Sequence, residues 1–249
     1  TNIDGALDAV SISINGGHGV EAYVVGTDGD FATTLNANYI SNWQRLYDND
    51  TSWLAGALVN TLTVGSFDFG WGDYNISTHN LEASKTFVIK TINGNYKKLR
   101  IDRLRFAKTF YISYADLDGS NAVTDSLVKT DYSSLLIHYS LDDERVVPIE
   151  PARGTWDLAF AKFQFEDYSQ GNNPITTERA SVRTAQGTFQ DTWRGTVGLG
   201  NSFDAVLANN NVSNIGYSWL DTTDKSIVSD ISYFVQNQNG CTWQIWMTD

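Results

Sequence analysis

The sequence predicts an all-β protein of antiparallel sheets, arranged as two related lobes. The first observation behind this prediction is an internal repeat: residues 70–101 align without a gap with residues 216–247, which lie 146 positions later (239 − 93 = 146). Both copies carry an Asn-Gly pair between two apolar runs, at Asn93-Gly94 and at Asn239-Gly240. Asn-Gly favours the tight turn of a β-hairpin because both turn residues take positive φ. Each copy is therefore expected to contain a hairpin around this turn.

The second observation is the composition of the chain. Its 249 residues include 8 Trp, 12 Tyr and 12 Phe but only 3 Pro. Glycine, Asn and Asp separate short apolar runs, which is typical of many short strands joined by turns. No segment of normal helix length combines helical periodicity with caps, apart from a weak pattern at Thr188–Arg194. These features favour sheets over helices.

Strands are expected in order along the first lobe, wherever apolar residues alternate or run together between turns. Residues 36–56 mix Asn, Asp and Ser with aromatic residues, and we expect a long ordered loop or short helical turns there. The expected strands are Val10–Ile14, Ala22–Val25, Ser66–Phe69, Lys85–Lys90, Tyr96–Ile101 and Arg105–Tyr114.

The boundary between the lobes is expected near residues 119–133, after a polar turn. The first lobe would cover residues 1–122, with its opening strands trimmed, and the second residues 123–249. Trp156–Phe165 is the most strongly β-patterned stretch of the second half. The second copy of the repeat lacks a strand equivalent to Arg105–Tyr114.

Charge and motifs exclude several classes of function. The net charge of −12 disfavours nucleic acid and anionic lipid surfaces. No run of 18 apolar residues is present, so no transmembrane segment is expected. Nucleophile-elbow, zinc-protease, P-loop and dinucleotide motifs are all missing, and we predict that the protein is not an enzyme. Cys241 is the only cysteine and is expected to pack as a small apolar side chain.

Aromatic residues in or beside loops are the candidates for stacking on a sugar or a porphyrin. The alternative is that they pack in the core, because Trp is usually well buried. The candidate ligand-binding residues are Trp43, Tyr47, Trp53 and Trp71.

Several strands and loops carry a resemblance to a known family. They include Trp156-Asp157-Leu158-Ala159-Phe160, Phe69-Gly70-Trp71-Gly72 and Ile14-Asn15-Gly16-Gly17-His18-Gly19. In these segments the chain resembles the HmuY family, haem-binding surface lipoproteins of Bacteroidetes-type bacteria, as two family-like units in tandem. The resemblance implies a noncatalytic binding protein, at the cell surface as an outer-membrane lipoprotein or secreted, that captures haem.

Haem iron takes a lone pair from histidine or methionine on each face. The candidate haem ligands are His18, in a glycine loop, His79, in a polar turn, and Met247, near the end of the repeat. Surface or core packing is the alternative for each. His138 lies in an apolar strand, where a packed histidine is the favoured interpretation. None of the four stands clearly at a family ligand position.

Acidic turns support a second hypothesis, a calcium-assisted glycan-binding or adhesion module. Asp116 and Asp118, in the sequence Asp116-Leu117-Asp118-Gly119, could offer oxygens to calcium, although the glutamate of a complete EF-hand loop is missing. The third hypothesis is a structural subunit of an outer-membrane surface assembly, which would have a protein partner. The ligand would be a small molecule or a glycan under the first two hypotheses.

Overall fold

The computed structural model confirms the predicted fold class. Strands make up 43% and helices 11% of it, and the strands pair in antiparallel fashion. The structure describes residues 10–49, 55–60, 62, 65–134, 136–152, 154–167, 175–184, 189–194, 208, 215–221, 223–224, 226–237 and 239–248.

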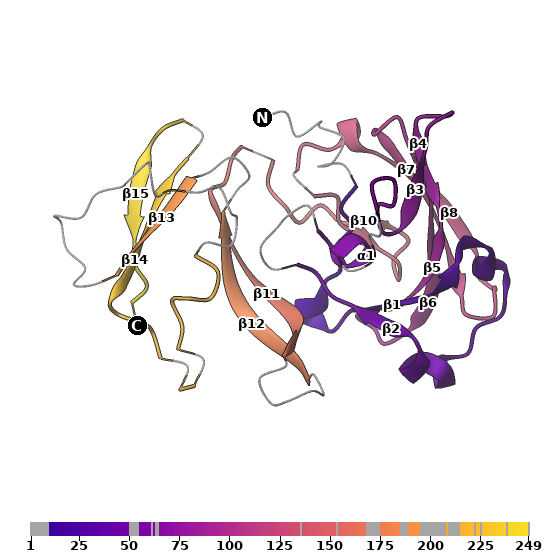
Figure 1. Cartoon of the computed structure of the whole chain (residues 1–249), viewed down its shortest axis with the longest axis horizontal. Helices are drawn as coiled ribbons and strands as arrows, with labels where there is room; N and C mark the ends of the chain where they lie inside the picture. Colours follow the sequence, from indigo (N-terminus) through magenta and orange to yellow (C-terminus); the bar gives the residue numbers. More distant parts are fainter. Residues whose placement is uncertain are drawn as a thin grey trace.

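Eight strands from the first half of the chain form one sheet. Its order is β2-β1-β5-β6-β4-β3, and β7 pairs with β6 and with β8. In Figure 1 this sheet occupies the right-hand side of the molecule. The strands are β1 (Glu21–Thr27), β2 (Gln44–Leu46), β3 (Gly72–Asn75), β4 (Asn80–Ala83), β5 (Lys85–Lys90), β6 (Tyr96–Arg105), β7 (Thr109–Asp116) and β8 (Val123–Val128).

Helical structure is short wherever the chain is described. The one α-helix there is α1 (Ala57–Asn60), a single turn. The remaining helical segments are 3-10 turns: η1 (Gly16–His18), η2 (Asp28–Ala32), η3 (Ala37–Asn42) and η4 (Lys129–Asp131). No helix in the described ranges is long and apolar enough to cross a bilayer.

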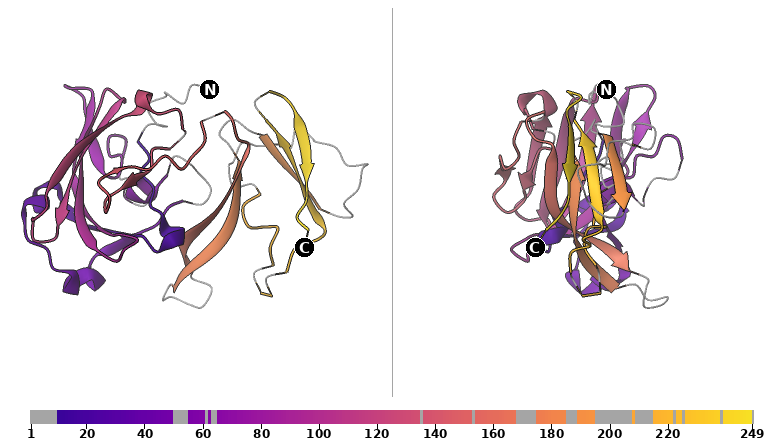
Figure 2. Two further views of the ribbon diagram at one scale, coloured as in Figure 1. Left: turned by 180° about the vertical axis from the view of Figure 1, so that it is seen from behind. Right: turned by 90° about the vertical axis from the view of Figure 1, so that its left-hand side faces the viewer.

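The later strands form three smaller sheets. A long hairpin joins β11 to β12, and β13-β14-β15 form a three-stranded sheet. The hairpin lies between the eight-stranded and three-stranded sheets in both views that show the molecule side-on (Figures 1 and 2). The bounds are β9 (Tyr139–Ser140), β10 (Arg145–Val146), β11 (Leu158–Asp167), β12 (Ile175–Thr184), β13 (Phe189–Arg194), β14 (Ile231–Gln236) and β15 (Thr242–Ile245).

The internal repeat of the sequence is also a repeat of strand pairing. In the first copy Phe87 on β5 faces Leu99 on β6. In the second copy Tyr233 on β14 faces Ile245 on β15. All four pairs between β5 and β6 recur between β14 and β15 with the same offset of 146 (87 + 146 = 233; 99 + 146 = 245).

The turns of the two copies match in the same way. Asn95 accepts a backbone hydrogen bond of 2.8 Å from Thr91, and Cys241 accepts one of 2.9 Å from Asn237 (95 + 146 = 241; 91 + 146 = 237). The glycines of both Asn-Gly pairs have left-handed φ values of 83° and 78°. Asn93 does not take positive φ, so the expectation that both turn residues do so is wrong in the first copy. The expected hairpin is therefore confirmed in both copies, whereas the division into two lobes stays a prediction.

Two separate hydrophobic cores lie against these hairpins. The first contains Phe87, Ile89 and Leu99. The second contains Tyr233 and Val235, with Ile245 packed against it. Because strand residues alternate between faces, equivalent positions of the repeat supply equivalent core residues.

The predicted boundary between the lobes falls inside the first sheet. β8 begins at Val123, where the second lobe was expected to start, yet it pairs with β7 along its length. Tyr139 and Leu141, further along the chain, pack against the first core. The first sheet and its core therefore extend beyond residue 122.

The strand expected at Arg105–Tyr114 is interrupted by a turn. β6 ends at Arg105, and Phe106 and Ala107 both have positive φ, at 50° and 54°. β7 starts at Thr109 and pairs back onto β6. Glycine and asparagine, the usual markers of such a turn, are absent here, so period-two alternation extended the prediction across it.

Five other sequence expectations are corrected or refined. Ser66–Phe69 forms a turn and an isolated bridge, Asp68 to Asp73, instead of the expected strand. Val10–Ile14 forms no ladder, although Ile12 and Ile14 pack against the first core. Residues 36–56 contain the expected helical turn, η3, and also the short strand β2. The weak helical pattern at Thr188–Arg194 is corrected over Phe189–Arg194, which forms a strand, β13. Cys241 is exposed, because it follows the hairpin turn directly.

Candidate functional site

Trp71 does not lie where a ligand could stack on it. Its side chain is completely buried in the first core. The indole N–H donates a hydrogen bond of 3.0 Å to the Val10 carbonyl oxygen, and the ring lies 6.0 Å from the Phe110 ring. The prediction that Trp71 lines a ligand site is therefore corrected in favour of the alternative, core packing.

Trp43 and Tyr47 flank strand β2 and are half-buried. The Tyr47 hydroxyl lies 3.0 Å from Thr176 Oγ1 on β12, and the Arg45 guanidinium lies 5.3 Å from the Tyr47 ring. Arg45 also donates a hydrogen bond of 3.0 Å to Gln164 on β11. Tyr47 thus contacts the β11–β12 hairpin. The fourth aromatic candidate, Trp53, lies outside the described residues.

His18 lies beside the same hairpin. It ends η1, which packs closely on β11: a Cβ built on Gly17 would lie 2.5 Å from the Lys162 carbonyl oxygen. This close approach explains the glycine, since a side chain there would collide with the neighbouring backbone. The His18 side chain itself is exposed.

Met247 packs against a core, and His138 has a polar partner. Met247 packs against the second core and is the counterpart of Ile101, a buried residue of the first core (101 + 146 = 247). His138 Nε2 lies 3.3 Å from Glu150 Oε2. The surroundings of both residues agree with a structural role.

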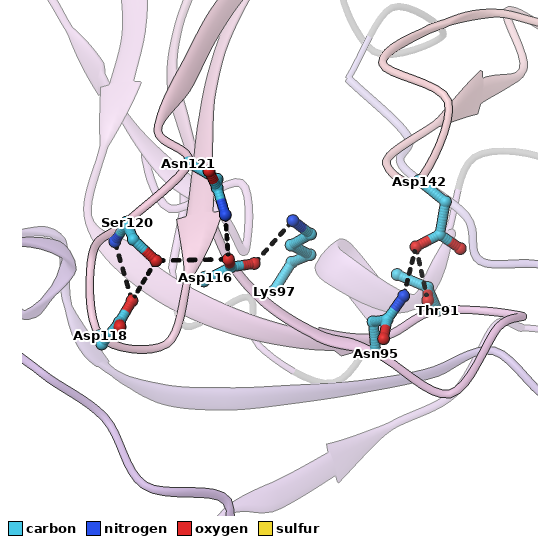
Figure 3. A network of polar contacts seen from close by, with 8 residues as sticks. All are labelled: Thr91, Asn95, Lys97, Asp116, Asp118, Ser120, Asn121 and Asp142. Atoms are coloured by element: carbon cyan, nitrogen blue, oxygen red, sulfur yellow. Dashed lines mark hydrogen bonds and ion pairs between the residues drawn. The ribbon is translucent and has the colours of Figure 1, made fainter.

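Asp116 and Asp118 belong to the polar turn between β7 and β8 (Figure 3). Lys97 Nζ lies 2.7 Å from one Asp116 oxygen, and Asn121 Nδ2 donates to the other at 2.6 Å. These hydrogen bonds, that of Lys97 first, hold the pKa of the Asp116 carboxyl below its usual value. Ser120 donates to Asp118 through both its N–H and its hydroxyl, at 2.8 and 2.6 Å.

The turn therefore has its own partners for both carboxylates. A calcium ion at Asp116 would have to displace the Lys97 ammonium group, which already balances the carboxylate charge. Over the described ranges, no group of three or more His, Cys, Asp or Glu side chains could hold a metal ion. In this structure hydrogen bonds within the turn and from Lys97 on β6 hold the two carboxylates.

A different cluster gathers around His79, and we call Phe67, Tyr74 and His79 the tip cluster. The Phe67 and Tyr74 rings are stacked, with centroids 6.2 Å apart and planes inclined by 12°. Tyr74 is hydrogen-bonded to His79, with 2.7 Å between its hydroxyl and Nδ1. Phe67 is 54% exposed, and Ile76, beside the cluster, is 63% exposed. The structure thus presents an aromatic surface with an imidazole at its border.

The hairpin of β3 and β4 positions this cluster. Asn75 ends β3, and its side-chain oxygen accepts hydrogen bonds from the N–H groups of Ser77 and Thr78. His79 then takes a φ of 56°, and its N–H donates to the Asn75 carbonyl oxygen at 2.8 Å. Positive φ is uncommon outside glycine and is enriched for histidine, asparagine and aspartate. The turn therefore fixes the place of the imidazole.

Two members of the tip cluster were not predicted from the sequence. Phe67 and Tyr74 stand on either side of Gly70-Trp71-Gly72, and Tyr74 donates a backbone hydrogen bond of 2.8 Å to Phe67 across this reversal. The glycines around Trp71 signal a turn, but only the folded backbone shows which flanking aromatic side chains meet.

Comparison of the chain with protein-family models, with curated proteins and with solved structures gives no match. The resemblance to the HmuY family, with the function that it implies, therefore stays a prediction.

Proposed function

We propose that this chain is a noncatalytic binding protein that captures a flat aromatic ligand, haem foremost, at the tip cluster. The observation that carries the proposal is the hydrogen bond between His79 Nδ1 and the Tyr74 hydroxyl. A histidine that binds a metal commonly engages its other ring nitrogen in such a bond, which fixes the tautomer and the ring orientation. Iron coordination requires the tautomer in which Nδ1–H donates to the Tyr74 hydroxyl oxygen, because only then does Nε2 carry the free lone pair.

The exposed Phe67 ring supports the same proposal. Its stacked partner Tyr74 holds it, so a planar ligand could lie against a rigid aromatic face. A porphyrin needs both an apolar face and an axial lone pair, and the tip cluster offers one of each. Of the three predicted haem ligands, His79 is the one whose surroundings fit this role.

Neither of the other two candidate haem ligands supports a second axial bond at the tip cluster. β15, which leads to Met247, and the β3–β4 hairpin, which carries His79, lie at opposite ends of the molecule in Figure 1. His18 lies in η1, whose close contacts are with β11. The proposal therefore assigns a single axial bond, from His79.

A haem titration followed by visible absorption tests this proposal. We expect a Soret shift with the unaltered protein. His79→Ala should bind haem at least about tenfold more weakly, because the axial bond is lost. Tyr74→Phe keeps the stacked ring but removes the hydrogen bond, and should weaken binding by a smaller factor. His18→Ala, an exposed histidine outside the cluster, is the matched control and should bind normally.

Two outcomes would contradict the proposal. A missing Soret shift with both ferric and ferrous haem would remove the haem ligand. A Soret shift that survives unchanged in His79→Ala would remove the tip cluster as its site.

Glycan binding is the second candidate, since the Phe67 and Tyr74 stack could also pack against a sugar ring. Calcium assistance at Asp116 and Asp118 belongs to this candidate. Thermal melting with calcium and with chelator tests it, because a ligand of the folded state raises the midpoint. Identical midpoints would count against a calcium site.

The resemblance to HmuY supports a location at the cell surface, or secretion. Protease treatment of intact native cells tests the surface location.

A further inference from the structure

We propose that the outer edge of β15, the edge turned away from β14, is a docking edge for β15 of a second copy of this chain. The two strands would pair antiparallel across a two-fold axis and join two three-stranded sheets into one. The internal repeat, the lack of charge along this edge and its exposed tryptophans support this pairing.

The repeat shows what such an edge accepts. β6 is the counterpart of β15, and β7 pairs antiparallel along the edge of β6 that is turned away from β5. There Lys97 faces Asp116, Leu99 faces Tyr114 and Ile101 faces Ile112. The counterparts of these three β6 residues are Trp243, Ile245 and Met247 (each plus 146). Among the strands that the structure describes, none pairs with the outer edge of β15.

The edge also lacks the charges that normally prevent strand pairing. Natural proteins protect exposed edge strands with lysines, prolines or bulges, because unpaired N–H and C=O groups otherwise recruit another strand. Residues 231–248 contain no charged residue and no proline. Their counterparts in the first copy include Lys85, Lys90, Lys97, Lys98, Arg100 and Asp102.

Tryptophans occupy two of these exchanged positions. Trp243 replaces Lys97 and is 58% exposed, and Trp246 replaces Arg100 and is 49% exposed. Trp243 lies in β15, and Trp246 directly follows Ile245, the last residue of the strand. Both indoles are therefore close to an added strand.

The repeat also specifies the occupant. β7 presents Phe110, Ile112 and Tyr114 at alternate positions to the first core. A strand that fits β15 in the same way must be uncharged and must present apolar side chains at every second position. β15 meets this requirement itself, with Trp243, then Ile245 and Met247 against the second core.

Charge favours a second copy as well. Two chains that each carry a net charge of −12 repel one another, and they can approach most closely through an uncharged surface. A two-fold axis makes the interface self-complementary, since the same strand edge serves both partners. With the axis at Ile245, Trp243 of one copy lies opposite Met247 of the other, which brings a thioether to an indole.

The paired edge is short, so we expect association that depends on concentration. β15 has four residues, so its edge is roughly 13 Å long. An edge of this length, with its flanking indoles, falls in the class of weak interfaces. Sedimentation velocity from about 1 µM to about 1 mM should show a monomer that converts to a dimer.

The test variant is Trp243→Lys with Trp246→Arg, which restores the charges of the first copy. The same fold already carries Lys97 and Arg100 at these positions, so the variant should fold, and circular dichroism checks this. We expect the dimer dissociation constant to rise about tenfold or more, because like charges from the two copies would crowd around the axis. Tyr39→Lys is the matched control: Tyr39 is 59% exposed in η3, away from β15, and its replacement should leave the constant unchanged.

Cys241 supplies a second, independent readout. It is exposed and is the only cysteine, so a spin label marks one site in each copy. With the axis at Ile245, the two labelled residues each lie four positions from it, and their Cα atoms are about 27 Å apart. An axis at Gln244 would shorten this to about 20 Å. Pulsed electron resonance at dimer-forming concentration measures the distance.

A monomer throughout the concentration range would overturn the proposal, even if a peptide of the β7 sequence were found to bind β15. A dimer that resists the charged double variant, or one that Tyr39→Lys weakens equally, would show that another surface is responsible. A label distance well beyond about 30 Å would exclude antiparallel pairing of the two β15 strands.

Discussion

Replacing the buried Trp71 by alanine should destabilise the protein more than any exposed aromatic substitution. The Trp71 ring is fully buried, and its N–H is bonded to the Val10 carbonyl oxygen at 3.0 Å. A buried tryptophan removes up to about 250 Å² from water. At about 25 cal/mol per Å², this burial contributes up to about 6 kcal/mol. Alanine retains a small part of it, and measured changes of this kind cost about 3–5 kcal/mol.

The lost hydrogen bond adds to this cost. The Val10 carbonyl oxygen would lose its indole donor, which costs about 1 kcal/mol. We therefore expect Trp71→Ala to lower the free energy of unfolding by about 4–6 kcal/mol. Trp71→Phe keeps most of the ring and loses the donor, so it should cost about 1–2 kcal/mol.

Urea unfolding followed by far-ultraviolet circular dichroism measures both variants. The matched control is Trp243→Ala, measured at low protein concentration, because that indole is 58% exposed and should cost less than about 0.5 kcal/mol. A cost below about 1 kcal/mol for Trp71→Ala would refute the reasoning, since the indole could not then be packed as the structure shows. Haem affinity of Trp71→Phe should be unchanged, because the buried ring faces no ligand.

Three further predictions concern turns and charge. Gly70→Ala should lower the free energy of unfolding by about 2 kcal/mol or more, because φ is 85° and a Cβ there would lie 2.6 Å from a backbone oxygen. Gly94→Ala has a similar φ of 83° but open space around the Cβ, so it should lower the free energy of unfolding by only about 1 kcal/mol. Urea unfolding measures both variants. The pKa of Asp116 is lowered in the folded state, first by its hydrogen bond to Lys97. The ionised carboxylate therefore stabilises the folded state above the unfolded pKa of about 4, and this contribution is lost as the pH falls through the folded pKa. Asp116→Asn should flatten the acid limb of a plot of stability against pH. Phe106→Asn should raise the free energy of unfolding by about 0.5–1 kcal/mol, because asparagine accepts the φ of 50° more readily than phenylalanine. The melting midpoint should rise accordingly, and an unchanged or lower midpoint would contradict this.

The repeated hairpin could be predicted because its causes are local. Asn93-Gly94 and Asn239-Gly240 select a tight turn, and alternating residues on both sides set the faces of the strands. The register across β5 and β6, and across β14 and β15, follows from the turn. The structure also accounts for a polar contact that sequence could not pair: Asp142 Oδ1 accepts from Thr91 and Asn95 in the first hairpin, at 3.0 and 3.2 Å (Figure 3).

The errors arose where a local pattern was ambiguous. The β6–β7 turn uses Phe106 and Ala107 at positive φ, which alternation alone cannot reveal. β13 showed a weak helical pattern, but pairing with β14 makes it a strand, so tertiary contacts outweighed the local preference. The first sheet continues through β8 because β7 offers it a free edge, although the polar turn before Val123 suggested a boundary.

The amino-acid sequence alone determined the antiparallel all-β class and the two matched hairpins, since turn chemistry and period-two alternation act over a few residues. Tertiary structure decided which aromatic side chains are exposed: it buried Trp71 and brought Phe67 and Tyr74 together beside His79. It also decided which strand edges are covered, pairing β7 with β6 but leaving β15 without a described partner on its outer edge. Burial and edge pairing depend on contacts between segments far apart in the chain, and no local pattern specifies those contacts.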